Sequence, residues 1–131
     1  MGSRSATELL LLPVQLHGIR LGRPVDLLFD PQAWRVLGFV VLCGDESRRF
    51  LPFAASLVAD EAITVGSALM LLDDAEFYEK RGVSFRSILG SELGGGIVRD
   101  VLLDGAGRVT ELEVERDGVR GPAPVPSRAA A

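Results

Sequence analysis

The sequence contains one cysteine, one histidine and one lysine, and each shortage excludes a class of site. Cys43 alone cannot form an internal disulfide. A single histidine, His17, disfavours both a zinc cage and a histidine-based catalytic triad. No nucleotide-binding motif is present, since the glycine run Gly94–Gly96 lacks the lysine and serine or threonine that a phosphate-binding loop needs. We therefore expect no catalytic site, no metal centre and no cofactor.

Long apolar runs are also missing. The four leucines Leu9–Leu12 fall far short of the run of about 18 apolar residues that a membrane span requires. Glu8 stands directly before them, so no signal peptide is indicated. With a mean hydropathy of +0.27, the chain is nevertheless too apolar to be disordered. We expect a folded cytoplasmic protein that does not insert into membranes but can join a membrane complex peripherally, through another protein.

Charge of either sign is modest. Fourteen basic residues against eighteen acidic ones give a net charge of -4 and a pI of about 5.0, so direct binding to nucleic acid is not expected. All basic residues except Lys80 are arginines, a bias typical of a GC-rich coding genome, and we expect a bacterial protein. At 131 residues the chain has the size of one ordinary domain or of two very small halves that share a core.

Glycine and proline separate short apolar runs, which is the pattern of an all-β chain. The predicted strands are Leu9–Leu16, Arg23–Phe29, Trp34–Cys43, Arg48–Phe53, Ala62–Val65, Gly96–Leu103, Arg108–Arg116 and Val119–Val125. One segment differs, because Asp73–Gly82 has acidic residues first, basic residues last and a glycine at its end. This order predicts a short linking helix, and Ser84–Leu89 can add another helical turn.

Two segments of the chain share one pattern, which indicates an internal repeat. Gly22–Asp30 and Gly96–Asp104 both read Gly-x-apolar-x-Asp-apolar-apolar-apolar-Asp. After one extra residue in the first turn, Arg35–Val41 aligns with Arg108–Val114, and Leu51-Pro52 can be set against Val125-Pro126. The positions that define the motif are Gly22, Asp26, Asp30, Gly96, Asp100, Asp104 and Gly107.

This pattern resembles PRC-barrel domains, the small β-barrels of the photosynthetic reaction-centre H subunit and of the C-terminal half of a ribosome maturation factor. The resemblance rests on Gly96–Val114 and, in the first copy, on Arg49–Ala54 and Ala62–Val65. It implies a docking module that holds partner proteins, RNA-processing assemblies or membrane complexes in place, without catalysis on the barrel itself. This chain departs from the family at Pro24, which replaces the usual β-former.

The second copy also ends before any equivalent of Ala62–Val65, so the Leu9–Leu16 strand or another chain must complete it. We expect an all-β fold of two PRC-barrel-like small β-barrel halves linked by a short helix. The predicted division is a first repeat at 8–72, a linking helix and turn at 73–90, a shorter second repeat at 91–127, and flexible ends at 1–7 and 128–131.

The leading functional prediction is a non-catalytic interaction or scaffold domain that docks an unknown protein or assembles with itself. Because one half lacks its closing strand, we expect a homo-oligomer such as a homodimer. One alternative is an accessory of ribosome assembly or RNA processing that acts through a ribosomal protein, which an acidic chain permits. The other is a small metal-dependent hydrolase that uses Asp26 and Asp100 as a carboxylate pair.

The four motif aspartates can also be purely structural. In a regular strand Asp100 shares a face with Val98 and Leu102, where a charge must be hydrogen-bonded or paired. On this interpretation Asp26 and Asp100 accept hydrogen bonds from the backbone of nearby loops, while Asp30 and Asp104 open turns.

The two copies differ on one face of the equivalent strand. Arg108–Arg116 alternates, so that Glu111, Glu113 and Glu115 point to water, whereas the first copy has Gly38, Val40 and Leu42 at those positions. A strand that is apolar on both faces must be covered on both. The cover comes either from the chain itself, as its other half or the linking helix through Phe77 and Tyr78, or from a second subunit or partner protein. We therefore take these six positions as candidate partner-binding residues.

Overall fold

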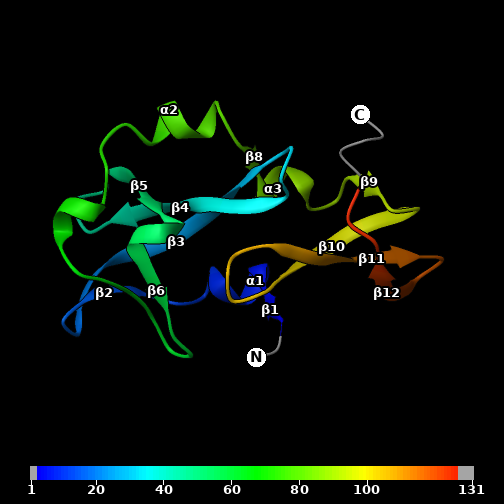
Figure 1. The fold of residues 1–131 in the computed structure, drawn as a ribbon, viewed down its shortest axis with the longest axis horizontal. Helices are drawn as coiled ribbons and strands as arrows, with labels where there is room; N and C mark the ends of the chain where they lie inside the picture. Colours follow the sequence, from blue (N-terminus) through cyan, green and yellow to red (C-terminus); the bar gives the residue numbers. More distant parts are fainter. Residues whose placement is uncertain (1–2, 127–131) are drawn as a thin grey trace.

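The computed structural model describes residues 3–126, which form two curled β-sheets with a few short helices (Figure 1). The first sheet contains β2 (Val14–Leu16), β3 (Ile19–Asp30), β4 (Arg35–Cys43), β5 (Arg48–Pro52), β6 (Ser56–Val58), β7 (Ile63–Val65) and β8 (Val83–Ser84). The second contains β1 (Arg4–Ser5), β9 (Glu92–Leu93), β10 (Gly96–Leu103), β11 (Val109–Arg116) and β12 (Val119–Ala123). The predicted all-β fold in two halves is thereby confirmed.

The helices are single turns. They are α1 (Ala6–Leu9), α2 (Ala75–Glu79), α3 (Phe85–Ile88) and two 3₁₀ turns, η1 (Phe53–Ala55) and η2 (Ala68–Met70). The linking helix expected at Asp73–Gly82 is α2, which Asp74 caps by accepting a hydrogen bond from the backbone N–H of Phe77. Within residues 3–126 no helix has the length and apolar character that crossing a membrane requires.

One hydrophobic core joins the two sheets. Its fully buried side chains come from both halves, including Leu27, Phe39 and Leu51 of the first sheet and Val101 and Leu112 of the second. The main core is therefore shared by the two halves, which pack as one unit.

Both sheets are built to the same plan. Each half runs in the order short strand, helical turn, short strand, and then three longer antiparallel strands, from β1 to β5 and again from β8 to β12. At the junction Arg35 and Arg108 face each other in an antiparallel bridge. The N–H of Val36 donates to the carbonyl of Gly107, and the N–H of Val109 donates to that of Trp34, both at 2.8 Å. These two equivalent bonds place an approximate twofold axis between the halves.

The strand registers give the alignment of the two copies. Leu51 pairs with Phe39, and Ala123 pairs with Leu112 at the equivalent place. Leu51-Pro52 therefore corresponds to Ala123-Pro124 and not to Val125-Pro126, because β12 is reached by a shorter hairpin than β5.

The two halves exchange their first elements. The N-terminal arm, residues 4–9, places β1 on β10 of the second sheet, where Arg4 pairs with Leu103 and Ser5 with Leu102. The middle arm, residues 83–88, places β8 on β3 of the first sheet, where Val83 pairs with Phe29 and Ser84 with Leu28. Each arm thus completes the sheet of the opposite half.

These arms correct two expectations. The strand predicted at Leu9–Leu16 is a helical turn followed by β2, and β2 joins the first sheet between β3 and β7 instead of completing the second. The flexible end predicted at 1–7 includes β1 and the buried Ala6. Residues 1–2 and the predicted flexible end at 128–131 lie outside the described residues.

A β-bulge in each half changes which way the motif aspartate points. The register shifts by one residue between Val98 and Asp100, and between Pro24 and Asp26. After the shift Asp100 lies opposite Glu113, while Val98 lies opposite the buried Val114. Asp100 therefore shares a face with Leu102 but not, as regular alternation predicts, with Val98, because the bulge inserts one unpaired residue.

The outer face of the first sheet is covered by the chain itself. Tyr78 of α2 stacks on Phe50 of β5 with ring centroids 4.2 Å apart, and Phe50 lies over Gly38 and Val40. Leu28, Val40, Phe50 and Ala75 form a small second core there. The linking helix thus provides the cover that the apolar face of this strand requires.

The repeat offers a matched test of this cover. Val40 and Glu113 occupy equivalent positions, yet Val40 is 0% exposed while the Glu113 side chain is 35% exposed. Val40→Glu buries a charge without a partner, and we expect it to lower the free energy of unfolding by at least about 3 kcal/mol. Glu113→Val removes one surface ion pair, and we expect a change within about 1 kcal/mol. Urea unfolding curves measure both, and equal effects would contradict the assignment of the two faces.

Candidate functional site

The carboxylate of Asp100 is held by the N-terminal arm. Ser5 Oγ donates to Asp100 Oδ2, while the backbone N–H and the hydroxyl of Thr7 donate to Oδ1 at 3.2 and 3.1 Å. The N–H of Val101 donates to the same oxygen at 2.8 Å. Ser5 also caps α1 by accepting from the N–H of Glu8 at 3.2 Å. The Ser5 hydroxyl therefore bonds both to the N-terminus of α1 and to the buried carboxylate of Asp100.

The middle arm holds Asp26 in the same way. Ser84 Oγ donates to Asp26 Oδ2, and the backbone N–H groups of Arg86 and Leu27 donate to Oδ1 at 3.2 and 2.9 Å. Ser84 caps α3 by accepting from the N–H of Ser87 at 3.3 Å. The two clasps, Ser5 with Asp100 and Ser84 with Asp26, are therefore related by the internal repeat.

These bonds define what the carboxylates can do chemically. Asp26 and Asp100 are the only polar side chains in the buried part of residues 3–126, and both oxygens of each carboxylate already accept hydrogen bonds. The two share no bonding partner, because each lies in its own sheet beneath its own arm. The structure thus places the two carboxylates in two separate clasps.

Asp30 and Asp104 open equivalent turns, as the sequence predicts. Asp30 Oδ1 accepts from the N–H of Gln32 at 2.8 Å, and Asp104 Oδ1 accepts from those of Ala106 and Arg108 at 2.9 Å. The N–H of Arg108 stabilises the charged form, so the pKa of the Asp104 carboxyl lies below its ordinary value.

The motif glycines occupy places with no room for a side chain. A Cβ at Gly22 would lie 2.4 Å from the carbonyl oxygen of Leu42, and one at Gly96 would lie 2.8 Å from that of Glu115. Gly107 combines a φ of +82° with the ring of Phe53 against its Cα. These motif residues hold strands and turns together.

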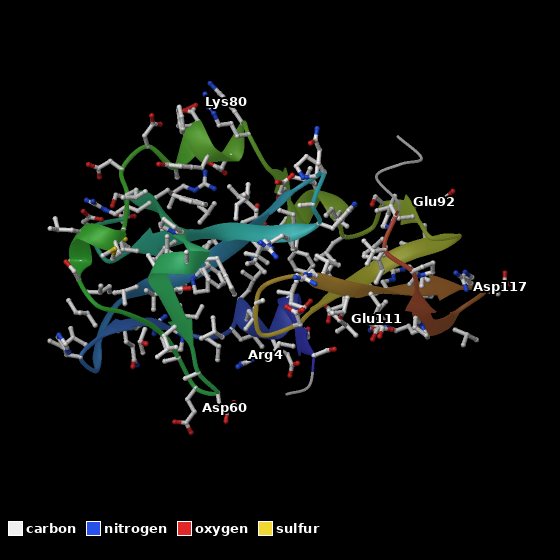
Figure 2. All side chains as sticks on the ribbon, in the orientation of Figure 1. Arg4, Asp60, Lys80, Glu92, Glu111 and Asp117 are labelled. Carbon is white, nitrogen blue, oxygen red and sulfur yellow. The ribbon has the colours of Figure 1, made fainter. Side chains whose placement is uncertain are left out.

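The candidate partner-binding residues of the second half lie on a partly exposed face. Glu113 and Glu115 stay about one third exposed, at 35% and 34%, and pair across strands with Arg120 and Arg99, the latter at 3.1 Å. Glu111 lies on the same face (Figure 2) and is part exposed. We call Glu111, Glu113 and Glu115 the glutamate face.

The candidates of the first half are separated by the structure. Gly38 and Val40 lie beneath Phe50, so a partner cannot contact them while α2 is in place. Leu42 stays part exposed, because it lies past the end of that cover, and it lines a surface groove together with Leu21 and Cys43.

This groove is the feature that the sequence did not reveal. It continues towards Ala68, Leu69 and Leu71, so three separate stretches of the chain build it. No local spacing signals such a site. Cys43 is half-buried in it, and burial raises the pKa of its thiol above the ordinary value despite the opposing charge of Arg49.

No family model matches the sequence, and no curated protein matches it.

Stability measurements test whether the clasps act as described. We expect Asp100→Asn to lower the free energy of unfolding by about 1.5–3 kcal/mol, because it removes charge-assisted hydrogen bonds to Ser5 and Thr7. In a double-mutant cycle, Asp100→Asn and Ser5→Ala should couple by more than about 0.5 kcal/mol, because the two side chains are in direct contact.

The second clasp supplies the control. Asp100→Asn combined with Ser84→Ala joins residues of different clasps and should be additive within about 0.5 kcal/mol. Additivity in the Ser5 cycle, or equal coupling in both, would show that the hydroxyl does not support its carboxylate.

Proposed function

We propose that this chain is a non-catalytic protein-interaction module of the PRC-barrel type, and that it docks a partner protein on the glutamate face. The observation that carries this proposal is the difference between two equivalent surfaces. The outer face of the first sheet is buried by α2, whereas the same face of the second sheet presents Glu111, Glu113 and Glu115 to solvent.

The edge strand of the second sheet, β12, disfavours strand addition, so a partner protein would contact the face of this sheet. In the first half, Phe50 extends the sheet by exchanging backbone hydrogen bonds with Leu72, at 2.9 and 2.8 Å. Pro122 stands at the equivalent position of β12 and has no N–H to donate. A partner strand therefore cannot be added there in the same way, and side chains on the sheet face are the available contacts.

The charge of this face indicates a basic partner. Three glutamates stand within five residues, and among residues 3–126 ion pairs with Arg99 and Arg120 compensate two of them. Complementary charge speeds association and excludes acidic surfaces. The same feature supports a second candidate function, in which the partner is a ribosomal protein and the chain assists ribosome assembly, because proteins that bind RNA are commonly basic.

Site-directed photo-crosslinking tests the proposal. A photo-reactive amino acid replaces either Glu111 or Lys80, which Figure 2 shows on different parts of the molecule, in cells that produce the protein. We expect discrete crosslinked products when the photo-reactive residue is at position 111. None of these products should form when it is at position 80. A product of twice the 14.0 kDa mass would identify a second copy as the partner.

The control reverses the charge while the probe stays in place. Glu113→Lys together with Glu115→Lys should abolish the products from position 111, because both substitutions repel a basic surface. Identical products from positions 111 and 80, or products that persist after charge reversal, would refute docking on the glutamate face.

A further inference from the structure

A groove crosses the first half at the end of the β3–β4 ladder. Two adjoining hollows of about 280 and 420 Å³ share Leu21, Cys43 and Gly44. The space beside Gly44 is open, since a Cβ there would meet nothing within 4 Å. The remaining lining is Arg20, Gly22, Arg23 and Leu42 at one end, and Asp45, Arg49, Ala68, Leu69 and Leu71 at the other.

The groove keeps apolar side chains exposed. Leu69 is 85% exposed and Met70 beside it is 40% exposed. Their position is held by η2, in which Ser67 Oγ accepts from the N–H of Leu69 at 3.1 Å. A capped turn thus presents a large apolar side chain to water at the groove's edge, where covering it would remove apolar area from solvent.

The charge of the groove is unlike that of the rest of the chain. Arg20 and Arg23 are exposed at one end, and neither lies within ion-pair distance of a carboxylate in the described part of the chain. At the other end Arg49 pairs with Asp73 at 2.7 Å and with Asp45 at 3.8 Å. In a chain of net charge -4, the Arg20 end is therefore a local positive site.

We infer that this groove binds a segment of a partner protein that carries both apolar side chains and carboxylates. The apolar side chains would pack on Leu21, Leu42 and Leu69. The carboxylates would pair with Arg20 and Arg23, whose guanidinium groups match a carboxylate in a two-point hydrogen bond.

The chemistry of the lining favours a peptide over a nucleic acid. Single-stranded nucleic acids bind by stacking bases on aromatic side chains as well as by pairing phosphates with basic ones. No lining residue of either hollow is aromatic. The groove lies in the first half and the glutamate face in the second, so the inference does not depend on docking at that face. A module with both surfaces can hold two partners of opposite charge.

A random library of twelve-residue peptides displayed on phage, selected on the full-length protein, tests the inference. We expect the selected peptides to be enriched in Asp or Glu together with Leu, Ile or Phe. The binding of a selected peptide, measured by fluorescence anisotropy, should weaken at least tenfold for Arg20→Glu/Arg23→Glu, and at least tenfold for Leu69→Asp. Bound peptide should also slow alkylation of Cys43 at least threefold.

The chain supplies a matched control. Arg35→Glu/Arg108→Glu changes the net charge equally, at two exposed arginines outside the groove. It should change peptide affinity less than twofold. Circular dichroism and thermal unfolding of each variant show that the fold is kept.

Three results would overturn the inference. The first is selection of no peptides, or of peptides without acidic residues. The second is equal weakening in the groove variant and the control. The third is binding of a twelve-nucleotide polyuridine probe that depends on Arg20 and Arg23 while no selected peptide competes with it, which would make the groove a nucleic-acid site. None of these results bears on the photo-crosslinks from position 111.

Discussion

The second half is organised around the hydrogen bonds that Ser5 and Thr7, near the N-terminus, donate to the buried carboxylate of Asp100. Ser84 and Asp26 repeat this interaction in the first half. A charge in this position must be fully hydrogen-bonded, because an unpaired buried carboxylate is strongly destabilising. The bulge before each aspartate turns it out of the common core, where its own strand supplies one donor, the N–H of the next residue, and the remaining donors must come from elsewhere. The arm of the other half supplies them, and the same serine begins the helical turn that carries the arm back into the core. One short motif thereby fixes the bulge, the arm and the exchange between halves.

Exchange of arms explains why two small repeats form one folding unit. A half of about 45 to 60 residues buries too little apolar surface to be stable by a wide margin. Ala6 and Leu9 from one arm and Phe85 and Ile88 from the other instead extend a single core shared by both sheets. The bridge at Arg35 and Arg108 adds backbone hydrogen bonds at the axis between the halves. Loss of either clasp is therefore expected to weaken the whole molecule and not one half alone.

The longer strands can be predicted from the sequence, because glycine and aspartate turns bound them and their apolar pattern is strong, as at Gly96–Leu103. Elements whose structure depends on distant parts of the chain cannot be predicted in this way. The arms share little beyond a capping serine and a four-residue turn, so Ser5–Leu9 and Ser84–Ile88 showed no visible repeat. The bulges break the two-residue alternation from which the neighbours of Asp100 were inferred. The linking helix can be predicted from the sequence. That this helix covers the outer face at Val40 follows only from the stacking of Tyr78 on Phe50. The groove at Cys43 joins segments up to about 50 residues apart, as loop-built sites commonly do, and no spacing could reveal it.

Because the two halves share one plan, equivalent positions of β4 and β11 can be compared in two different surroundings. Gly38 has no room for a side chain: a Cβ there would lie 2.3 Å from the carbonyl oxygen of Leu51 and 2.5 Å from the phenyl ring of Phe50. At the equivalent of Phe50 the second half has Pro122, which brings no large ring over the sheet, and Glu111 therefore has room and solvent. The exchange of one aromatic residue for proline thus accompanies the change from a covered apolar face to an open charged one. In the first half, the layer formed by α2 and Phe50 does not reach Leu42. Leu42, at the apolar end of β4, therefore lines the groove at Cys43. The two surfaces proposed for docking arise from the same cause, since each lies where α2 and its aromatic contacts do not reach.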